Sequence, residues 1–250
     1  MQDSHEYKQK KEFFQKLITL YGRNVVVEVL QDKTINIYKL HLAQSNKYDN
    51  TIKKIIKLAK ERDIKILYHD RDALSRISKN KKQDQGVAVD IDAPLYQHAK
   101  QIQKLSTFRL IALDGIHNPQ NLGMIIRSCA AGNIDGIILP KKNSAKISPL
   151  VVKASAGTLF KIPIYFCDTL TEVLSQLNNT QSIALSLDAQ STLYDFQESN
   201  KTIYILGNET EGVSKEVLQL CNEQLLIPMN RGVESLNVAV TASLIAFKRS

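Results

Sequence analysis

The stretch IPMNRGVESLNVAVTASLIAFKRS, residues 227–250, decides how the second half of this chain folds. Residues 236–247 are apolar except for Asn237, Thr241 and Ser243, a composition that predicts a helix buried on nearly all sides. Three polar residues crowd the start of this helix, directly after the strand-like segment LLIPM: Glu234, Ser235 and Asn237. Because an N-cap needs only one small polar side chain, the others need a different explanation.

Strand-like and helix-like segments alternate through residues 108–250. Strands are predicted at FRLIALDGI, GIILP, IPIYF, SIALSL, TIYILG and LLIPM. Helices are predicted at NLGMIIRSCAAGN, at SPLVVKASAG with Ser148 as its N-cap and Gly157 at its end, near 170–177 and near 215–222. This alternation predicts an α/β domain whose mostly parallel sheet is covered on both faces.

The first half of the chain predicts a second, smaller α/β domain over residues 21–91. A short helix follows YGRN, strands are expected at 35–43, 65–69 and 85–91, and helices at 49–62 and 72–79. Residues 1–20 are interpreted as a charged lead-in. The polar segment 92–107 is interpreted as a linker, in part helical.

The excess of positive charge lies in the first half of the chain. Residues 1–109 carry 22 Lys and Arg against 13 Asp and Glu, a net charge of +9, whereas residues 110–250 carry 11 against 12, a net charge of −1. A basic segment of this kind indicates a polyanionic partner, most often nucleic acid. The alternative is a solvated basic surface without a specific partner.

Several classes of protein are disfavoured by the composition. No run of 18 apolar residues indicates a membrane span, and MQDSHEYKQKKEFF lacks the apolar core of a signal peptide. Cys129, Cys167 and Cys221 are odd in number and far apart, which indicates reduced core cysteines in a cytoplasmic protein without a disulfide framework or zinc site.

Ligands of parallel α/β sheets bind outside the carboxyl ends of strands, so the loops there hold the candidate site residues. In the first such loop, residues 113–128, Asn121 is a candidate cap and Arg127 is the one charge on an otherwise apolar or small-residue helix. Gly123 and Ala131 flank Arg127 at helical spacing and would permit a close approach. The alternative is an ordinary ion pair between Arg127 and Asp114.

Two more loops follow strands. In YILGNETEGVS, residues 204–214, Gly207 and Gly212 flank acidic residues, which suits a hydroxyl or a cationic ligand better than a phosphate. The alternative is a plain turn before a helix. In the third loop, residues 227–237, either Ser235 or Asn237 caps the last helix, and the remaining polar groups point into the strand-end crevice.

Familiar motifs of other enzyme classes are missing. The sequence has no GxGxxG after a strand, no HExxH, no GxSxG and no His/Cys cluster, and its five histidines are scattered. A nucleotide-dependent oxidoreductase and a metal site are therefore disfavoured.

Taken together, NPQNLGMIIRS, ILGNETEG and IPMNRGVESLNVAV resemble the SpoU family of RNA ribose 2′-O-methyltransferases in order and spacing. KASAGTLFKIPI between them is also similar to the family, and the resemblance spans residues 105–250. The segment from YGRNVVVEVL to QGVAV resembles the small ribosomal-protein-like RNA-binding domain of the rRNA branch. Within that branch, the likeness is greatest to enzymes that methylate a guanosine of 23S rRNA.

The resemblance implies a trefoil-knotted SPOUT methyltransferase domain at residues 108–250, S-adenosylmethionine bound in the knot, and an active site formed across a homodimer. It assigns catalytic roles to Asn121, Arg127, Glu209, Ser235 and Asn237. It assigns cofactor contacts to Leu187, Gly207, Asn208, Gly212, Ile227, Met229 and Leu236. RNA binding is assigned to the N-terminal domain, through Arg23, Asn24, Lys53, Lys54 and Lys57.

The implied reaction is attack by a ribose 2′-hydroxyl on the sulfonium methyl. Arg127 would remove the proton with help from an RNA phosphate, or it would clamp a phosphate or polarise the hydroxyl while water takes the proton. Two alternatives stay open for the protein as a whole: the same chemistry on tRNA or another rRNA site, and a non-catalytic RNA-binding or ribosome-assembly protein.

Overall fold

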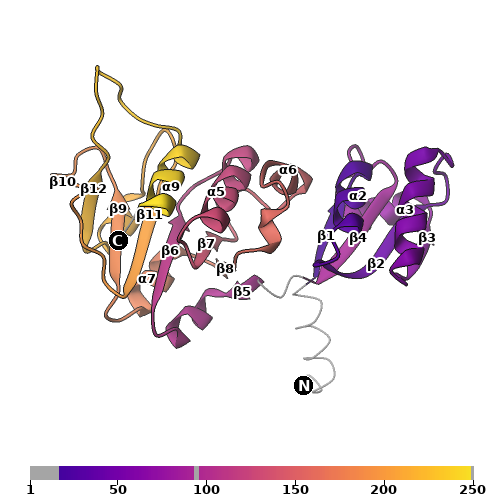
Figure 1. Cartoon of the computed structure of the whole chain (residues 1–250), viewed down its shortest axis with the longest axis horizontal. Helices are drawn as coiled ribbons and strands as arrows, with labels where there is room; N and C mark the ends of the chain where they lie inside the picture. Colours follow the sequence, from indigo (N-terminus) through magenta and orange to yellow (C-terminus); the bar gives the residue numbers. More distant parts are fainter. Residues whose placement is uncertain (1–16, 93–95, 249–250) are drawn as a thin grey trace. The chain divides into compact units, whose positions relative to one another are not determined.

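The computed structural model describes residues 17–92 and 96–248, and the chain divides into two compact units, Met1–Pro94 and Leu95–Ser250 (Figure 1). Each unit has its own sheet and helices. Among the described residues, no helix combines the length and apolarity needed to cross a bilayer.

Unit 1 is built on a four-stranded sheet in the order β1-β4-β2-β3. The strands are β1 (Leu17–Tyr21), β2 (Asn36–Ala43), β3 (Ile66–His69) and β4 (Val87–Asp92). β4 runs antiparallel to both of its neighbours, and β2 and β3 are parallel. β1 lies partly inside the predicted lead-in, because the alternating segment LITLY pairs residue for residue with β4.

Three helices complete unit 1: α2 (Arg23–Gln31), α3 (Asn50–Glu61) and α4 (Arg71–Ser78). Asp49 and Asp70 cap α3 and α4 by accepting hydrogen bonds from backbone N–H groups of the first turn. α2 packs against α3, and α4 places Leu74 on Ala43 and Ala88 of the sheet. The predicted α/β organisation of this half is therefore confirmed.

Unit 2 is built on an eight-stranded sheet in the order β10-β12-β9-β11-β6-β7-β8-β5, with every neighbouring pair parallel. Its strands are β5 (Tyr96–His98), β6 (Phe108–Leu113), β7 (Gly136–Pro140), β8 (Ile164–Cys167), β9 (Gln181–Leu185), β10 (Ser191–Thr192), β11 (Lys201–Leu206) and β12 (Glu223–Leu226). β6 is buried along its whole length and β11 from Thr202 onward, as is typical of strands covered on both faces.

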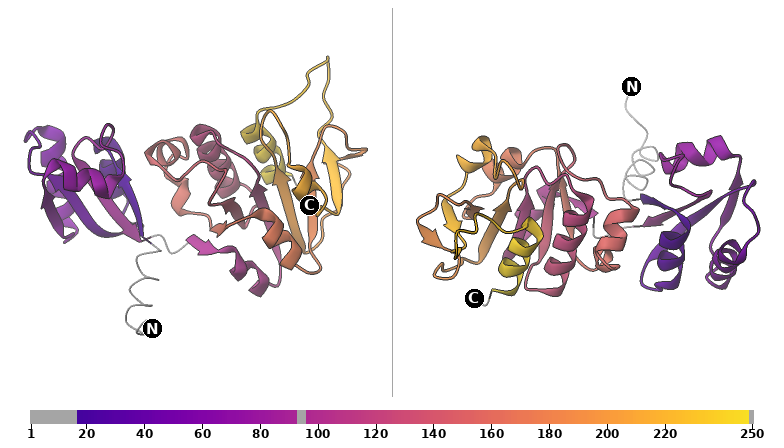
Figure 2. Two further views of the ribbon diagram at one scale, coloured as in Figure 1. Left: turned by 180° about the vertical axis from the view of Figure 1, so that it is seen from behind. Right: turned by 90° about the horizontal axis from the view of Figure 1, so that it is seen from above.

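Helices cover both faces of this sheet. On one face α5 (Pro119–Ala131) packs against α6 (Pro149–Ala154) and α9 (Val238–Phe247), and both views in Figure 2 show α5 and α9 side by side. On the other face the 3₁₀ segment η1 (Ala99–Lys104), α7 (Leu170–Gln176) and α8 (Lys215–Leu218) close one hydrophobic core over β6, β7, β8 and β11. A 3₁₀ turn, η2 (Thr158–Phe160), follows α6.

Several boundaries differ from those predicted. The segment 92–107 is not all linker, because β5 extends the sheet beside β8 and η1 buries Ala99 and Ile102. The strand predicted at LLIPM ends at Leu226, so residues 227–229 lie beyond it. The predicted helices at SPLVVKASAG and near 215–222 end earlier, at Ala154 and Leu218.

The last helix is not buried on nearly all sides. Val238, Ala239, Ala242, Ile245 and Ala246 are buried, but Val240 is 42% exposed and Phe247 is 61% exposed. The described part of this chain therefore leaves some of the apolar side chains of α9 exposed to solvent.

A buried ionic cluster fixes the end of α9. Arg109 on β6 donates Nε to Glu198 Oε2 at 2.5 Å and Nη2 both to Glu198 Oε1 at 3.0 Å and to the carbonyl of Ile245 at 2.8 Å. Tyr204 Oη and Lys248 Nζ also donate to Glu198 Oε1, at 2.7 and 3.2 Å. One carboxylate thereby joins β6, β11 and the residue that follows α9.

Acid should weaken unit 2 through this cluster. Burial alone would raise the pKa of Glu198, but its hydrogen bonds with Arg109, Tyr204 and Lys248 lower that pKa from 4.5 to about 2. Because the folded pKa is depressed, the stabilisation is present above the unfolded pKa and is lost as pH falls from about 5 towards 2, a loss of about 3 kcal/mol. Urea unfolding at several pH values should show this loss in the native protein and a flatter acid limb in Glu198→Gln; identical pH profiles would contradict it.

Candidate active site

The carboxyl ends of four adjacent strands, β12, β9, β11 and β6, meet along one edge of the unit 2 sheet. All three loops singled out in the sequence leave the sheet here: residues 114–118 after β6, 207–214 after β11 and 227–237 after β12. Leu187 follows β9 at the same edge, where the Ser186 N–H donates to the Leu225 carbonyl at 3.0 Å. The parallel topology thus gathers these segments at one place.

Asn121 is the centre of the site. It lies inside α5 and is buried, so it does not cap the helix as predicted; Asn118 does, by accepting from the Gln120 N–H at 2.8 Å. Asn121 Nδ2 donates to Glu209 Oε1, and Asn121 Oδ1 accepts from Asn237 Nδ2 at 3.2 Å. One buried amide therefore joins the three loops.

The polar residues before α9 have separate tasks. Asn237 is the N-cap, because its Oδ1 accepts from the Ala239 N–H at 2.9 Å, and its Nδ2 is the group that reaches Asn121. Glu234 and Ser235 are exposed, on a segment that Figure 1 shows extending away from the sheet between β12 and α9. Of the predicted catalytic residues, the structure brings Asn121, Glu209 and Asn237 together and leaves Ser235 in solvent.

The loop after β11 is a tight turn that positions Glu209. Asn208 and Gly212 exchange both backbone hydrogen bonds, at 3.0 and 2.9 Å, and Asn208 Nδ2 donates to the Gly115 carbonyl at 3.0 Å. A Cβ at Gly207 would lie 2.0 Å from the backbone of Gly212, so glycine is required here by the turn itself. The segment is therefore a tight turn, and the same turn holds the exposed carboxylate of Glu209 over Asn121. A turn and a ligand-binding loop are compatible interpretations of this segment.

Asp114 supports the same turn and was not predicted as a site residue. Its Oδ2 accepts from the Ser214 N–H at 2.8 Å, and its own N–H donates to the Leu206 carbonyl at 2.8 Å. The sequence offered a signal, because an acidic residue directly after a buried strand usually has a partner.

Arg127 lies on the exposed side of α5, beside Met124 and away from Asn121. Within the described ranges 17–92 and 96–248 it has no ion pair or hydrogen bond, and Asp114, the alternative partner, is engaged elsewhere. The close approach predicted at Gly123 is made by the chain's own α6, since a Cβ there would meet Ala154 Cβ at 2.5 Å. Arg127 is thus an unpaired, permanently charged group next to apolar surface.

The predicted cofactor contacts differ in exposure. Ile227 is buried and Met229 is partly buried, whereas Leu187 and Leu236 are 64% and 36% exposed. Gly207, Asn208 and Gly212 form the turn, and a Cβ on Gly212 would have open space around it. These residues therefore border a strand-end region with an apolar rim and open space beside Gly212.

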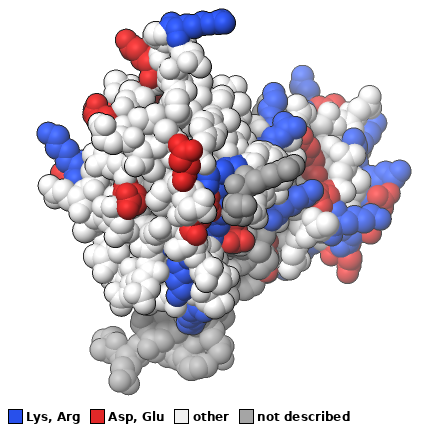
Figure 3. Space-filling view, turned by 60° about the vertical axis from the view of Figure 1, so that its left-hand side comes forward, with Lys and Arg blue, Asp and Glu red and all other residues white. Residues whose placement is uncertain are grey.

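The predicted RNA-binding residues all lie in unit 1. Lys53, Lys54 and Lys57 are exposed on α3, and Asn24 is exposed in the first turn of α2. Arg23 is held in place: it pairs with Asp49 and donates Nε to the Gln85 carbonyl at 3.3 Å. In contrast, Figure 3 shows one face of unit 2 as largely uncharged surface.

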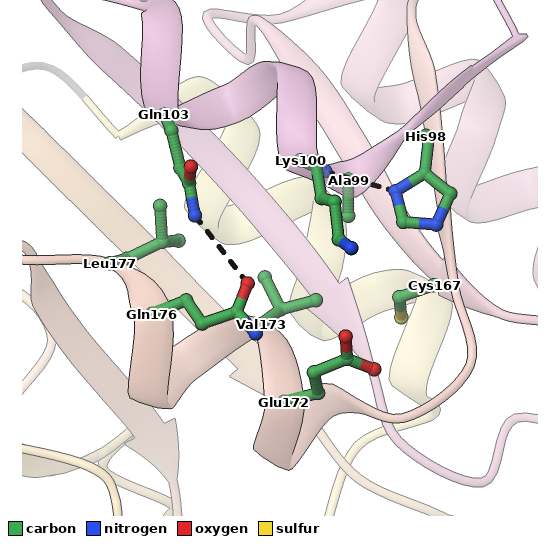
Figure 4. Close-up of a pocket in the computed structure, with 9 residues that line it drawn as sticks. All are labelled: His98, Ala99, Lys100, Gln103, Cys167, Glu172, Val173, Gln176 and Leu177. Atoms are coloured by element: carbon green, nitrogen blue, oxygen red, sulfur yellow. Dashed lines mark hydrogen bonds between the residues drawn. The ribbon is translucent and has the colours of Figure 1, made fainter.

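Other parts of unit 2 do not add to the site. A shallow pocket on the η1 and α7 side contains no predicted site residue; there His98 Nδ1 accepts from the Lys100 N–H and Gln103 donates to Gln176 (Figure 4). Burial raises the pKa of the Cys129 and Cys167 thiols to about 12, which makes them inert. No group of three His, Cys, Asp or Glu side chains within the described residues is placed to hold a metal ion.

Comparison with known proteins gives the family. Residues 109–247 match the model of the SpoU rRNA Methylase family, and residues 19–97 match the model described as RNA 2′-O ribose methyltransferase substrate binding. The chain belongs to the SpoU methyltransferase family. The predicted enzyme class is therefore confirmed, and the buried amide of Asn121 joins the three segments that carried the resemblance.

Relatives agree with this assignment. The chain is 31% identical over 233 residues to the "uncharacterized tRNA/rRNA methyltransferase" of Mycobacterium avium (strain 104), covering 91% of this chain and 75% of that protein. The fold is similar to the AdoMet-bound rRNA methyltransferase from Sinorhizobium meliloti, with a TM-score of 0.66, 22% identity, and coverage of 96% and 89%. It is also similar to the SpoU methyltransferase AviRb from Streptomyces viridochromogenes in complex with AdoMet, with a TM-score of 0.68, 20% identity, and coverage of 98% and 91%.

Proposed function

We propose that this SpoU family member transfers a methyl group from S-adenosylmethionine to a ribose 2′-hydroxyl of RNA, specifically at a guanosine of 23S rRNA. The observation that carries the proposal is the linked set Glu209–Asn121–Asn237, which joins the three family segments at one sheet edge. Asn121 is the buried member of this set, and its amide holds the exposed Glu209 and Asn237 together at the strand ends. Such an enzyme would act in the cytoplasm, where rRNA is modified.

The strand-end region fits S-adenosylmethionine by its chemistry. The exposed Leu187 and Leu236 and the buried Ile227 offer apolar surface for an adenosyl group, and there is open space beside Gly212. We assign cofactor contacts to these residues, together with Gly207, Asn208 and Met229. When bound, the cofactor supplies a methyl group on a sulfonium, which is an excellent leaving group.

The residues of the chain then position the hydroxyl and assist loss of its proton. Asn121 has both amide atoms engaged, so it acts as a positioning residue for Glu209 and Asn237. Glu209 presents an exposed carboxylate that can accept a hydrogen bond from the ribose, and Ser235 offers an exposed hydroxyl two residues before Asn237. A guanidinium is a poor proton acceptor, so Arg127 clamps an RNA phosphate or polarises the hydroxyl, and water takes the proton.

A homodimer would complete the site. Arg127, Met124 and Val240 are exposed on the adjoining helices α5 and α9, and Phe247 adds further apolar surface to α9. A second copy placed on these helices would cover the apolar side chains that one chain leaves in water and would bring Arg127 to the partner's site. Sedimentation of the native protein and of Val240→Glu tests this arrangement; a monomeric native enzyme with full activity would refute it.

Unit 1 would supply RNA affinity through its lysines. Phosphate contacts of Lys53, Lys54 and Lys57 give salt-dependent binding, and selectivity then comes from RNA shape and unstacked bases. Deleting residues 1–94 is expected to preserve S-adenosylmethionine binding by unit 2, measured by calorimetry, and to abolish selective methylation of rRNA. The deletion should end at 94, because β5 and η1 belong to the sheet unit. A truncated protein with unchanged target choice would contradict the prediction.

The deciding experiment is mass spectrometry of nucleosides from rRNA and tRNA of a strain that lacks the gene, complemented with the native gene or with Glu209→Ala. Loss of one 2′-O-methylguanosine from 23S rRNA, restored only by the native gene, supports the proposal. Loss from tRNA would keep the chemistry and change the substrate. Unchanged ribose methylation would favour a non-catalytic RNA-binding protein.

A further inference from the structure

Much of the positive charge in residues 110–250 lies in one segment. Residues 136–167 contain five Lys and no Arg, Asp or Glu, a net charge of +5. The rest of residues 110–250 carries six Lys and Arg against twelve Asp and Glu, a net charge of −6. Three of the five lysines lie in the loop of residues 141–148 that joins β7 to α6: Lys141, Lys142 and Lys146. The catalytic residues assigned above do not include this loop.

The loop after β7 lies beside the candidate active site. β7 pairs with β6 in the parallel sheet, so the carboxyl ends of both strands reach the same edge. The Ala145 N–H donates to the Ile116 carbonyl at 2.7 Å, which attaches this loop to the loop after β6. The carbonyl of the preceding residue, Gly115, accepts from Asn208 Nδ2 at 3.0 Å, in the turn that carries Glu209. Two consecutive residues of one loop therefore connect the basic loop with the catalytic turn.

The loop is held in place at its start, while two of its lysines have no partner. The Lys141 N–H donates to the Cys167 carbonyl at 2.9 Å, and Lys141 Nζ pairs with Asp168 Oδ1 at 3.1 Å. Lys142 and Lys146 are exposed, and neither side chain has an ion pair or hydrogen bond with any residue that the structure describes. Both ammonium groups are therefore available to an external anion.

The neighbouring strand-end loops are acidic. The loops after β6, β8, β9, β11 and β12 contain a single Lys or Arg, Arg231, against six Asp and Glu: Asp114, Asp168, Asp188, Glu209, Glu211 and Glu234. These carboxylates repel a polyanion, so an RNA that enters the site needs cations close by to hold its phosphates. Lys142 and Lys146 place two such cations at this edge.

We propose that the loop after β7 is a second RNA-binding surface, on which Lys142 and Lys146 bind backbone phosphates next to the target nucleotide. The inference rests on the proposed RNA substrate and adds to it the element of unit 2 that holds the RNA chain at the catalytic residues. A lysine binds phosphate as a point charge, so this contact is independent of sequence and depends strongly on salt.

The salt dependence of RNA binding tests the proposal. The full-length double variant Lys142→Ala/Lys146→Ala is compared with the native chain, with in vitro transcribed 23S rRNA as the probe. For single-stranded RNA each lost phosphate contact lowers the slope of log affinity against log salt by about 0.7, so the slope should fall by about 1.4. The affinity ratio of native to variant should therefore be about 25-fold larger at about 0.05 M salt than at about 0.5 M. At low salt the KM for RNA should rise with kcat unchanged, because the contact lies outside the reacting atoms.

Two further variants control for the charge that is removed. Lys153→Ala/Lys161→Ala takes two exposed lysines from the same acid-free segment but outside the loop, one on α6 and one before the amino end of β8. Its salt slope should stay native. Lys142→Arg/Lys146→Arg keeps both charges and should also keep the slope. Binding of S-adenosylmethionine, measured by calorimetry, should be native in all three variants and shows that unit 2 is folded.

A native salt slope and KM in the folded Lys142→Ala/Lys146→Ala variant would overturn the proposal, and methylation of rRNA by the native enzyme would then leave the proposed function standing. An equal loss of slope in Lys153→Ala/Lys161→Ala would also overturn it, since the effect would belong to net charge alone. If the native enzyme binds 23S rRNA through Lys142 and Lys146 but transfers no methyl group, only the proposed reaction is refuted.

Discussion

Substituting Arg127 by alanine is expected to lower kcat for RNA methylation by about 10²–10⁴-fold, the usual range for a lost acid–base or charge-stabilising group. The melting temperature should not fall, because Arg127 is exposed and has no ion pair or hydrogen bond in the part of the chain that the structure describes. Single-turnover methyl transfer to rRNA from the deletion strain measures the chemical step directly.

Arg127→Lys is the matched variant. It keeps the charge but loses the planar, five-donor guanidinium, so it should not restore the rate if a fork of hydrogen bonds is required. Lys161→Ala, which removes an exposed lysine outside the three site loops, serves as the control for general loss of positive charge. Near-native turnover by Arg127→Ala would remove this residue from the mechanism.

The largest loss of stability is expected from Arg109→Ala. Arg109 makes four side-chain hydrogen bonds, to Glu198, to the Asn133 carbonyl and to the Ile245 carbonyl. Removing it leaves Glu198 buried with Lys248 as its one cationic partner among the described residues. Breaking a buried pair by deleting one partner costs about 3–5 kcal/mol. The free energy of unfolding, from urea titration, should fall by that amount.

A double substitution distinguishes charge from packing. Arg109→Met with Glu198→Gln removes both charges while keeping most of the volume, so it should recover a large part of the loss. If the double variant is as unstable as the sum of the single variants, the cluster contributes through packing and not through ion pairing.

Much of the fold was predictable because the parallel sheet makes its strands apolar throughout and its helices amphipathic. The strand-end location of Asn121, Glu209 and Asn237 followed from this pattern, and the resemblance supplied the family. β5 was missed because an edge strand of three residues, Tyr96–His98, has no periodicity to detect. The exposure of Val240 and Phe247 could not be read from sequence, since an apolar helix looks the same whether its own chain or another molecule covers it.

The hydrogen-bond partners of Asn121 could not be predicted from the sequence. Asn121 was the predicted cap of α5, but Pro119 occupies the first helical turn and the residue before it, Asn118, is the cap. That frees Asn121 to join Glu209 and Asn237. The trefoil knot stays a prediction from the resemblance.

The buried ionic cluster that joins Arg109 to the end of α9 has a consequence for the order of folding. Arg109 belongs to β6, in the middle of the unit 2 sheet, and Ile245 is separated from it by 136 residues. At a synthesis rate of about 5–20 residues per second, the ribosome adds Ile245 several seconds after Arg109. The hydrogen bond from Arg109 to the Ile245 carbonyl cannot form before then. Unit 2 therefore cannot mature strand by strand, and a nascent chain stalled before residue 245 would expose the faces of β6 and α5 that α9 later covers.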